Sequence, residues 1–200
     1  EFMAPGVIIL TAIFTSIFGG VNTLWDRRYG FMNKALTSPI SRSAIAVGKM
    51  SAISLIAALQ ASLIIGIALA IGVTFPNPLM IIPIMGIVIL FSLGFSGISV
   101  TLAATAKSQE TFWGMINLLG MPLFMLSPAL FPLELLPDWL AVIAKLNPVT
   151  YTILLVRELM TGVSEGGVPI LLSVGVIFAF VIAMVAIASY VFTREVNKPF

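Results

Sequence analysis

The chain has 200 residues, of which 60% are hydrophobic and only 9% are charged, and its mean hydropathy is +1.14. Because soluble domains carry about 25% charged residues, this composition indicates a membrane protein. The absence of cysteine and histidine from the sequence excludes disulfide bonds, thiolate or histidine catalysis and the usual zinc sites. We therefore predict no catalytic, cofactor-binding or metal-binding residues and a protein that is not an enzyme. The ten lysine and arginine residues form no basic stripe for nucleic acid.

Long stretches without charge predict an all-α fold, a polytopic bundle of membrane helices. A transmembrane helix needs about 20 mostly apolar residues, and we find five such spans, roughly at 3–24, 50–73, 79–106, 111–131 and 168–192. Each span is too long and too uniformly apolar for a half-buried strand. We expect residues 1–200 to form one membrane domain.

The basic residues predict how the chain is oriented in the cell membrane. Five of them lie between the first two spans: Arg27, Arg28, Lys34, Arg42 and Lys49. The next link, 74–78, has none, so the first link is expected in the cytoplasm, and alternation places the C-terminus there too. Residue 1 would then lie outside, directly before an apolar span. We therefore expect one more span upstream, and six in the full protein.

The first link, residues 25–49, is too long for a tight turn. A short amphipathic helix is expected at 29–36, because the residue before Pro39 disfavours the α conformation. Such a helix is suited to docking a partner protein, although charges that only set the topology are the alternative interpretation. The candidate docking residues are Asp26, Arg27, Arg28, Tyr29, Gly30, Phe31, Leu36, Pro39 and Arg42.

The outer segment, residues 132–167, predicts two short helices after the fourth span breaks near Pro128 and Pro132. The first helix begins at Pro137 and stops at Asn147-Pro148, and its apolar face consists of Leu136, Leu140, Ile143 and Leu146. The second helix, 149–161, ends at Gly162 and reaches about 20 Å, which is less than the hydrocarbon core of about 30 Å. We expect a hairpin of two helices that is either interfacial or re-entrant.

Polar residues within apolar stretches are candidates for the substrate path or for helix packing. Gln60 lies in the middle of the second span, where an amide usually bonds to a neighbouring helix, with substrate contact as the alternative; Asn117 fits either role. Arg157 and Glu158 lie on the second short helix. They are either functional residues within the membrane or a charged pair whose side chains extend to the membrane–water interface. A face of small residues for close helix packing is expected at Ser92, Ser96 and Ser99.

Two parts of the sequence resemble one membrane-protein family. The first link has the order acid-Arg-x-x-Gly, which is followed by Leu36-x-x-Pro39, Ser41-Arg42 and Gly48-Lys49. The outer segment contains Leu136-Pro137-Asp138-Trp139-Leu140, Leu146-Asn147-Pro148-Val149-Thr150-Tyr151 and Arg157. Both are similar to the permeases of type-2 ATP-binding-cassette (ABC) transporters, most of all the drug-resistance, daunorubicin-type branch. The family's first membrane helix has no counterpart in this sequence.

The resemblance implies the permease subunit of an ATP-driven exporter, which moves an amphipathic drug or lipid-like substrate by alternating access. The link 25–49 would hold the coupling helix, which sits in a cleft of a separate ATPase subunit, and ATP and Mg²⁺ would bind to that subunit. A second permease copy is implied, in a homodimer or a heterodimer. Export of a polysaccharide or glycoconjugate is the alternative, which aromatic residues along the path would favour. A channel or scaffold outside the family is a further alternative, but a channel would need charged rings or a carbonyl filter.

Overall fold

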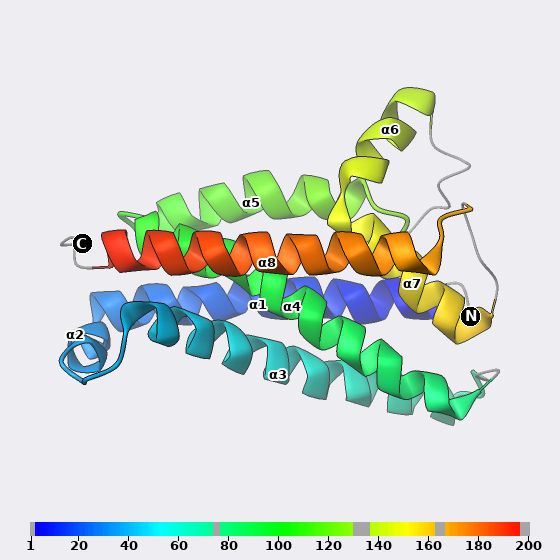
Figure 1. Ribbon diagram of the computed structural model, residues 1–200, viewed down its shortest axis with the longest axis horizontal. Coiled ribbons are helices and arrows are strands. Elements are labelled where there is room, and N and C mark those ends of the chain that lie inside the picture. The colour runs from blue at the N-terminus through cyan, green and yellow to red at the C-terminus, as the bar shows by residue number, and fades with distance from the viewer. Residues whose placement is uncertain (1–2, 74–76, 130–136, 163–166, 197–200) are drawn as a thin grey trace.

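The computed structural model describes residues 3–73, 77–129, 137–162 and 167–196 (Figure 1). Within these ranges the chain forms helices and no strand, which confirms the predicted all-α class. The elements are α1 Met3–Arg28, α2 Phe31–Leu36, α3 Arg42–Ala70, the 3-10 helix η1 Pro78–Met80, α4 Ile81–Thr105, α5 Gln109–Met125, α6 Asp138–Leu146, α7 Pro148–Thr161 and α8 Ile170–Glu195.

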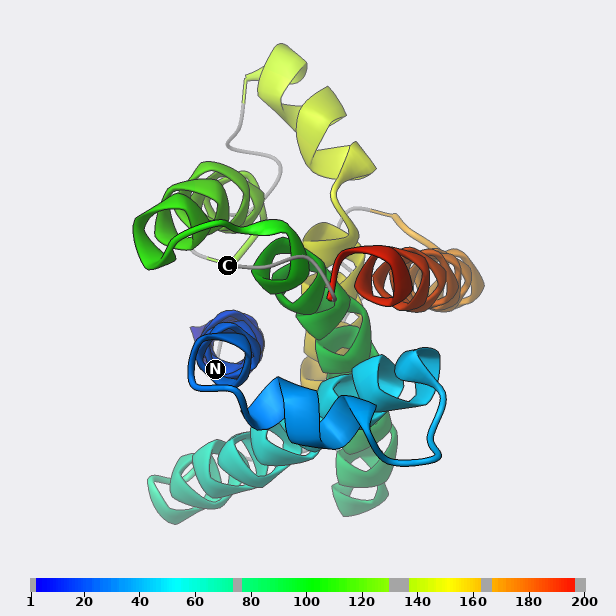
Figure 2. The same ribbon diagram turned by 90° about the vertical axis from the view of Figure 1, so that its left-hand side faces the viewer.

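The long helices lie side by side along the longest axis of the molecule (Figure 1). Helices α1, α4 and α8 run in one direction, and α3 and α5 run in the other. One end of the bundle therefore carries α2 and the C-terminus of α8, and the other carries the N-terminus of α1 and the α6–α7 pair. We call these the α2 end and the hairpin end. Figure 2, viewed from the α2 end, shows α1 between α5 and α3. Helix α4 packs against α1, α3 and α8.

The predicted spans correspond to the long helices, with two changes of boundary. Four described helices are long and apolar enough to cross a membrane: Ala4–Arg28, Arg42–Ala70, Pro78–Thr105 and Ile170–Glu195. Helix α5 has 17 residues, or about 25 Å, which is the lower limit for a spanning helix. It ends at Met125, before Pro128, as the predicted break requires, while 130 and 131 lie outside the described residues. The second span begins at Arg42 rather than at Met50, because Ser41 caps α3 there.

The two short helices α6 and α7 form the predicted hairpin. Pro137 is the N-cap of α6, and Gly162 ends α7 with φ 73°, while Leu136 lies outside the described residues. The pair bends by 83°, and α7 is buried against α1 and α8. Helix α6 runs from the hairpin end toward the middle of the bundle, and α7 returns to that end (Figure 1). Helix α7 thus enters the bundle instead of lying on its surface, which matches the re-entrant alternative in shape.

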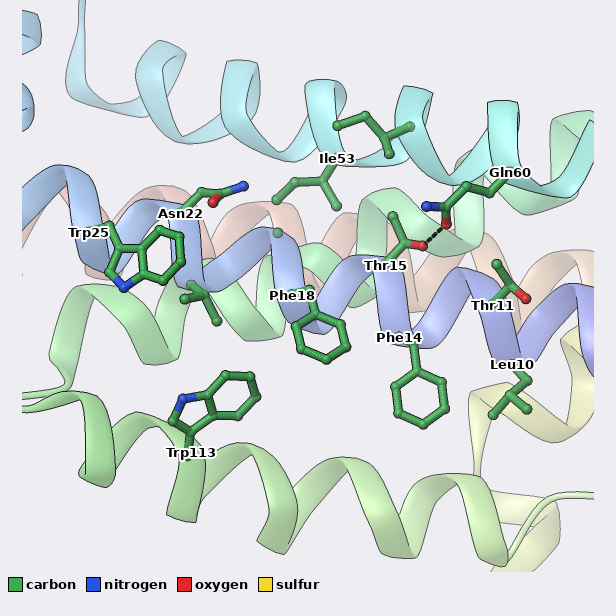
Figure 3. A pocket seen from close by; sticks show the side chains of 13 residues that line it. Leu10, Thr11, Phe14, Thr15, Phe18, Asn22, Trp25, Ile53, Gln60 and Trp113 are labelled. Carbon is green, nitrogen blue, oxygen red and sulfur yellow. Dashed lines mark hydrogen bonds between the residues drawn. The ribbon is translucent and has the colours of Figure 1, made fainter.

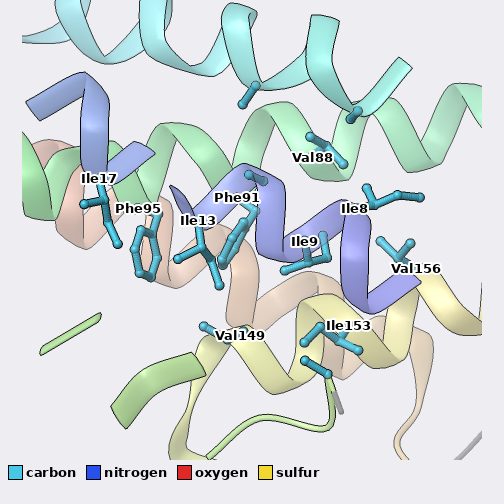
Figure 4. Close-up of a cluster of buried hydrophobic side chains, with 14 of the residues drawn as sticks. Ile8, Ile9, Ile13, Ile17, Val88, Phe91, Phe95, Val149, Ile153 and Val156 are labelled. Atoms are coloured by element: carbon cyan, nitrogen blue, oxygen red, sulfur yellow. The ribbon is translucent and has the colours of Figure 1, made fainter. Parts of the chain in front are cut away.

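The main apolar cluster of the described residues consists largely of side chains of α1, α4 and α7, with further contributions from α3 and α5. Figure 4 shows Ile9 and Ile13 of α1 beside Phe91 of α4 and Val149 and Ile153 of α7, all of them buried. Small residues let α1 and α4 approach closely, as predicted for the buried face of Ser92, Ser96 and Ser99. The Ser99 hydroxyl donates to the Ser16 carbonyl at 2.6 Å, which joins the two helices.

Candidate functional site

The connection between α1 and α3 carries α2 at the end of the bundle. Helix α1 ends at Arg28, and Gly30 has φ 77°, a left-handed conformation that favours glycine and turns the chain into α2. Helix α2 ends before Pro39, and the Ser41 hydroxyl then accepts the Ala44 N–H at 3.3 Å to begin α3. The predicted helix is therefore present. It begins at Phe31 rather than at Tyr29, because residues 29 and 30 form the turn.

One face of α2 is anchored and the other is open. The Met32 side chain is 2% exposed and packs in a cluster with Met50 of α3 and Phe192 of α8. Leu36 is half-buried and packs against the same cluster. Tyr29 and Phe31 are 68% and 60% exposed, and Ile40 is exposed beyond them. We call Tyr29, Phe31 and Ile40 the α2 surface. Aromatic side chains on an element fixed by a core contact are suited to docking another protein.

The charged residues that flank α2 contact other helices of the bundle. The Arg27 Nη1 donates to the carbonyls of Ala103 at 2.7 Å and Ala104 at 2.8 Å, in the last turn of α4. The Arg42 Nη1 donates to the Thr193 carbonyl at 3.2 Å, in the last turn of α8. Because the last carbonyls of a helix have no partner within it, both arginines act as side-chain caps. Asp26 forms an ion pair with Lys49 of α3.

These contacts divide the predicted docking residues into three groups. Asp26, Arg27 and Arg42 hold the connection on the bundle, and Gly30 and Leu36 shape and seat α2. The residues exposed at the α2 end are Arg28, Tyr29, Phe31 and Pro39. All nine stay candidate docking residues, and these four are the ones whose residues are exposed in the structure.

A groove of about 670 Å³ lies between α1, α3 and α5 (Figure 3). Phe14, Phe18 and Trp25 of α1 line it, and Trp113 of α5 faces them from the opposite side. The Phe18 and Trp113 rings meet edge to face, with their centroids 5.7 Å apart. Gln60 of α3 also lines the groove and accepts a hydrogen bond from the Thr15 hydroxyl of α1. Gln60 therefore joins two helices, as predicted for packing, and also borders a space that could hold a ligand.

Asn117 of α5 lies at a second, smaller cavity. This cavity of about 140 Å³ is on the α1–α5 contact and shares Phe14, Phe18 and Trp113 with the groove. Asn117 is exposed. The structure thus brings Gln60 and Asn117 to two spaces that border the same row of aromatic side chains.

Arg157 and Glu158 of α7 lie apart from these two spaces. The Arg157 side chain is 1% exposed, and its Nη2 donates to the Pro128 carbonyl at 2.8 Å. A guanidinium buried in this way does not fit the alternative of a pair that reaches the interface. Glu158 is half-buried. Neither residue lines the groove or the smaller cavity, so the four candidate path residues do not form one site.

The residues of these regions that were not predicted as candidates include Phe14, Phe18 and Lys49. The spacing of Phe14 and Phe18 by four residues places both on one face of a helix, as a helical wheel would have shown. Lys49 has the charge opposite to Asp26, and both lie near the α2 end of their helices. Position in the sequence gave no sign that α1 would leave this face open.

Comparison with known proteins identifies relatives along most of the chain. Residues 1–161 match the family model of the ABC-2 type transporter. The ycf38 protein of Cyanophora paradoxa, which carries the name of a transport permease, is 31% identical over 160 residues, or 80% of this chain and 55% of that protein. Nodulation protein J of Sinorhizobium fredii is 25% identical, and the match covers 89% of this chain and 68% of that protein. The daunorubicin resistance ABC transporter permease protein DrrB1 of Streptomyces coeruleorubidus is 23% identical, and the match covers 90% of this chain and 65% of that protein. The chain spans about half the length of the ycf38 relatives it matches.

Proposed function

Because the chain belongs to the ABC-2 type transporter permease family, we propose that it is the membrane-spanning part of an ATP-driven exporter for an amphipathic drug or lipid-like substrate. It is a multi-pass membrane protein. The observation that carries the proposal is the α2 surface: the exposed side chains of Tyr29, Phe31 and Ile40, on and beside a helix that Met32 anchors in the bundle.

The α2 surface docks the ATPase subunit, and that subunit binds ATP and Mg²⁺. The α2 end of the bundle is then cytoplasmic, together with the C-terminus of α8, and the hairpin end lies outside. The distribution of charge supports this orientation, because basic residues concentrate around α2, as is typical of cytoplasmic links.

The groove between α1, α3 and α5 is the proposed substrate path. Its volume of about 670 Å³ falls within the usual range for ligand pockets, about 300–1,000 Å³. Aromatic side chains line one part of it, and Asn22, Thr15 and Gln60 supply polar groups. This combination suits a substrate with a flat apolar body and a few hydrogen-bonding groups. A second permease copy, identical or related, completes the path across the membrane.

A second candidate function is export of a glycoconjugate. Aromatic residues along the path were the feature expected to favour it, and both Trp25 and Trp113 line the groove. The name of nodulation protein J does not state a substrate, so this candidate depends on the groove alone.

The test uses the full-length permease, reconstituted with its ATPase in liposomes. A fluorescent planar aromatic dye and a fluorescent glycolipid are the two probes of ATP-dependent transport. Phe14→Ala and Gln60→Leu are expected to reduce transport, whereas Leu55→Ala, an exposed residue of α3 outside the groove, serves as the matched control. Transport of the dye supports the first function, and transport of the glycolipid alone supports the second. If neither probe moves while ATP is hydrolysed, both substrate classes are wrong.

A further inference from the structure

Arg27 joins the end of α1, next to α2, to the end of α4. Its guanidinium binds the carbonyls of Ala103 and Ala104 and lies 3.4 Å from the carbonyl of Ala106, the C-cap of α4. Hydrogen bonds from a charged donor are among the stronger ones in proteins. The side chain therefore holds α1, immediately before the turn into α2, against the link between α4 and α5.

The link held by Arg27 is short. Helix α4 ends at Thr105, and Ser108 already caps α5, its hydroxyl accepting the Thr111 N–H at 3.1 Å. Residues 106–108 can absorb little displacement, so a shift of the α4 end reaches the first turn of α5. Trp113, which lines the groove, lies one turn further along α5.

Along the rest of their length, α1 and α4 are held together independently of Arg27. The Ser99 hydroxyl bonds to the Ser16 carbonyl, and a Cβ at Gly20 would lie 2.5 Å from the Ser99 Cβ. This contact can serve as the fixed part against which the α2 end moves. The groove is lined by residues of α1, α3 and α5 and by none of α4.

We propose that Arg27 is a positioning residue that transmits displacement of α2 to α5, and so sets the width of the groove beside Trp113. The proposal rests on the proposed function, since it takes the docked ATPase as the source of the displacement. Asp26 and Lys49 hold the same turn to α3, so α3 follows α1 while the wall formed by α5 moves.

The test measures the distance between α3 and α5 in the full-length permease bound to its ATPase. Spin labels are placed on Gly48→Cys and Gly114→Cys, where an added Cβ meets no atom within 4 Å, and the sequence has no other cysteine. With an otherwise native chain, ATP should change this distance. In Arg27→Gln the change should be lost, and transport per ATP hydrolysed should fall about tenfold. Lys145→Gln, which removes an exposed cation of α6 at the hairpin end, is the control and should behave as the native chain.

Arg27→Lys keeps the charge on a shorter side chain and should restore part of both responses, which loss of folding could not explain. An Arg27→Gln complex that keeps the ATP-dependent distance change and native coupling would overturn the proposal. So would an Arg27→Gln permease that no longer binds the ATPase, because Arg27 would then act in docking. A native permease that binds no ATPase would overturn the proposed function itself, and this inference with it.

Discussion

The guanidinium of Arg157 on α7 and the carbonyl of Pro128, just beyond the end of α5, form a buried hydrogen bond of 2.8 Å. A second contact joins the same two regions: the Asn147 side-chain amide donates to the Leu123 carbonyl. Leu123 lies in the last turn of α5, where carbonyls lack partners within the helix. The hairpin is thus attached to the end of α5 by two side-chain contacts with backbone carbonyls.

Replacing Arg157 should destabilise this attachment. In Arg157→Leu the buried Pro128 carbonyl loses a charged donor, so we expect the free energy of unfolding to fall by about 1–3 kcal/mol. Thermal unfolding in detergent measures the effect. Lys145→Gln, at an exposed position of α6, is the control and should unfold at the native temperature. Equal unfolding temperatures for Arg157→Leu and Lys145→Gln would show that the bond does not stabilise the fold.

The Thr15–Gln60 hydrogen bond should contribute measurably to helix packing. Interhelical bonds of this kind contribute about 0.6 kcal/mol on average, so the double-mutant cycle of Thr15→Val and Gln60→Leu should give a coupling of that size. The cycle is measured by unfolding in mixed micelles. Ser62→Ala is the matched control on α3, because its hydroxyl bonds only within its own helix, to Leu59. A coupling near zero, with transport still reduced in Gln60→Leu, would assign Gln60 to substrate contact alone.

The short elements of this fold could be predicted because their ends have specific backbone requirements. Gly162 has the left-handed conformation that ends α7, and Pro137 precedes the first turn of α6. The start of α3 was harder to predict. Ser41 is a good N-cap, but we took Arg42 and Lys49 as signs of a loop, whereas both lie in the helix, near its start.

The packing of the long helices could not be predicted from the sequence. Phe18 is exposed on the groove and Ile17 is buried in the core, yet the two are equally apolar neighbours. In a membrane, lipid and protein interior favour the same side chains, so hydrophobic periodicity does not reveal which face packs. The contacts of Arg27 and Arg157 were equally hidden, because both bind backbone carbonyls of residues far away in the sequence.

Neighbouring residues of α2 should separate anchoring from docking. Met32→Ala removes a buried side chain and should lower the free energy of unfolding by about 2–5 kcal/mol. Phe31→Ala removes an exposed ring and should leave the unfolding temperature unchanged, while weakening association with the ATPase. Unfolding and co-purification of the complex measure the two effects. Native ATPase binding by both Phe31→Ala and Tyr29→Ala would exclude the α2 surface as the docking element.

Two glycines of similar helical setting should respond in opposite ways to an added side chain. At Gly20 a Cβ would lie 2.5 Å from the Ser99 Cβ and 2.9 Å from the Ser99 backbone carbon, so Gly20→Val must push α1 away from α4. We expect a loss of about 1–3 kcal/mol in the free energy of unfolding, and weakening of the Ser99–Ser16 bond. At Gly48 nothing lies within 4 Å of an added Cβ, and alanine stabilises a helix interior by about 1 kcal/mol relative to glycine. Gly48→Ala should therefore unfold at or above the native temperature. Thermal unfolding of both variants decides the matter, since a tolerated Gly20→Val would mean that α1 and α4 are not held in close contact at this point.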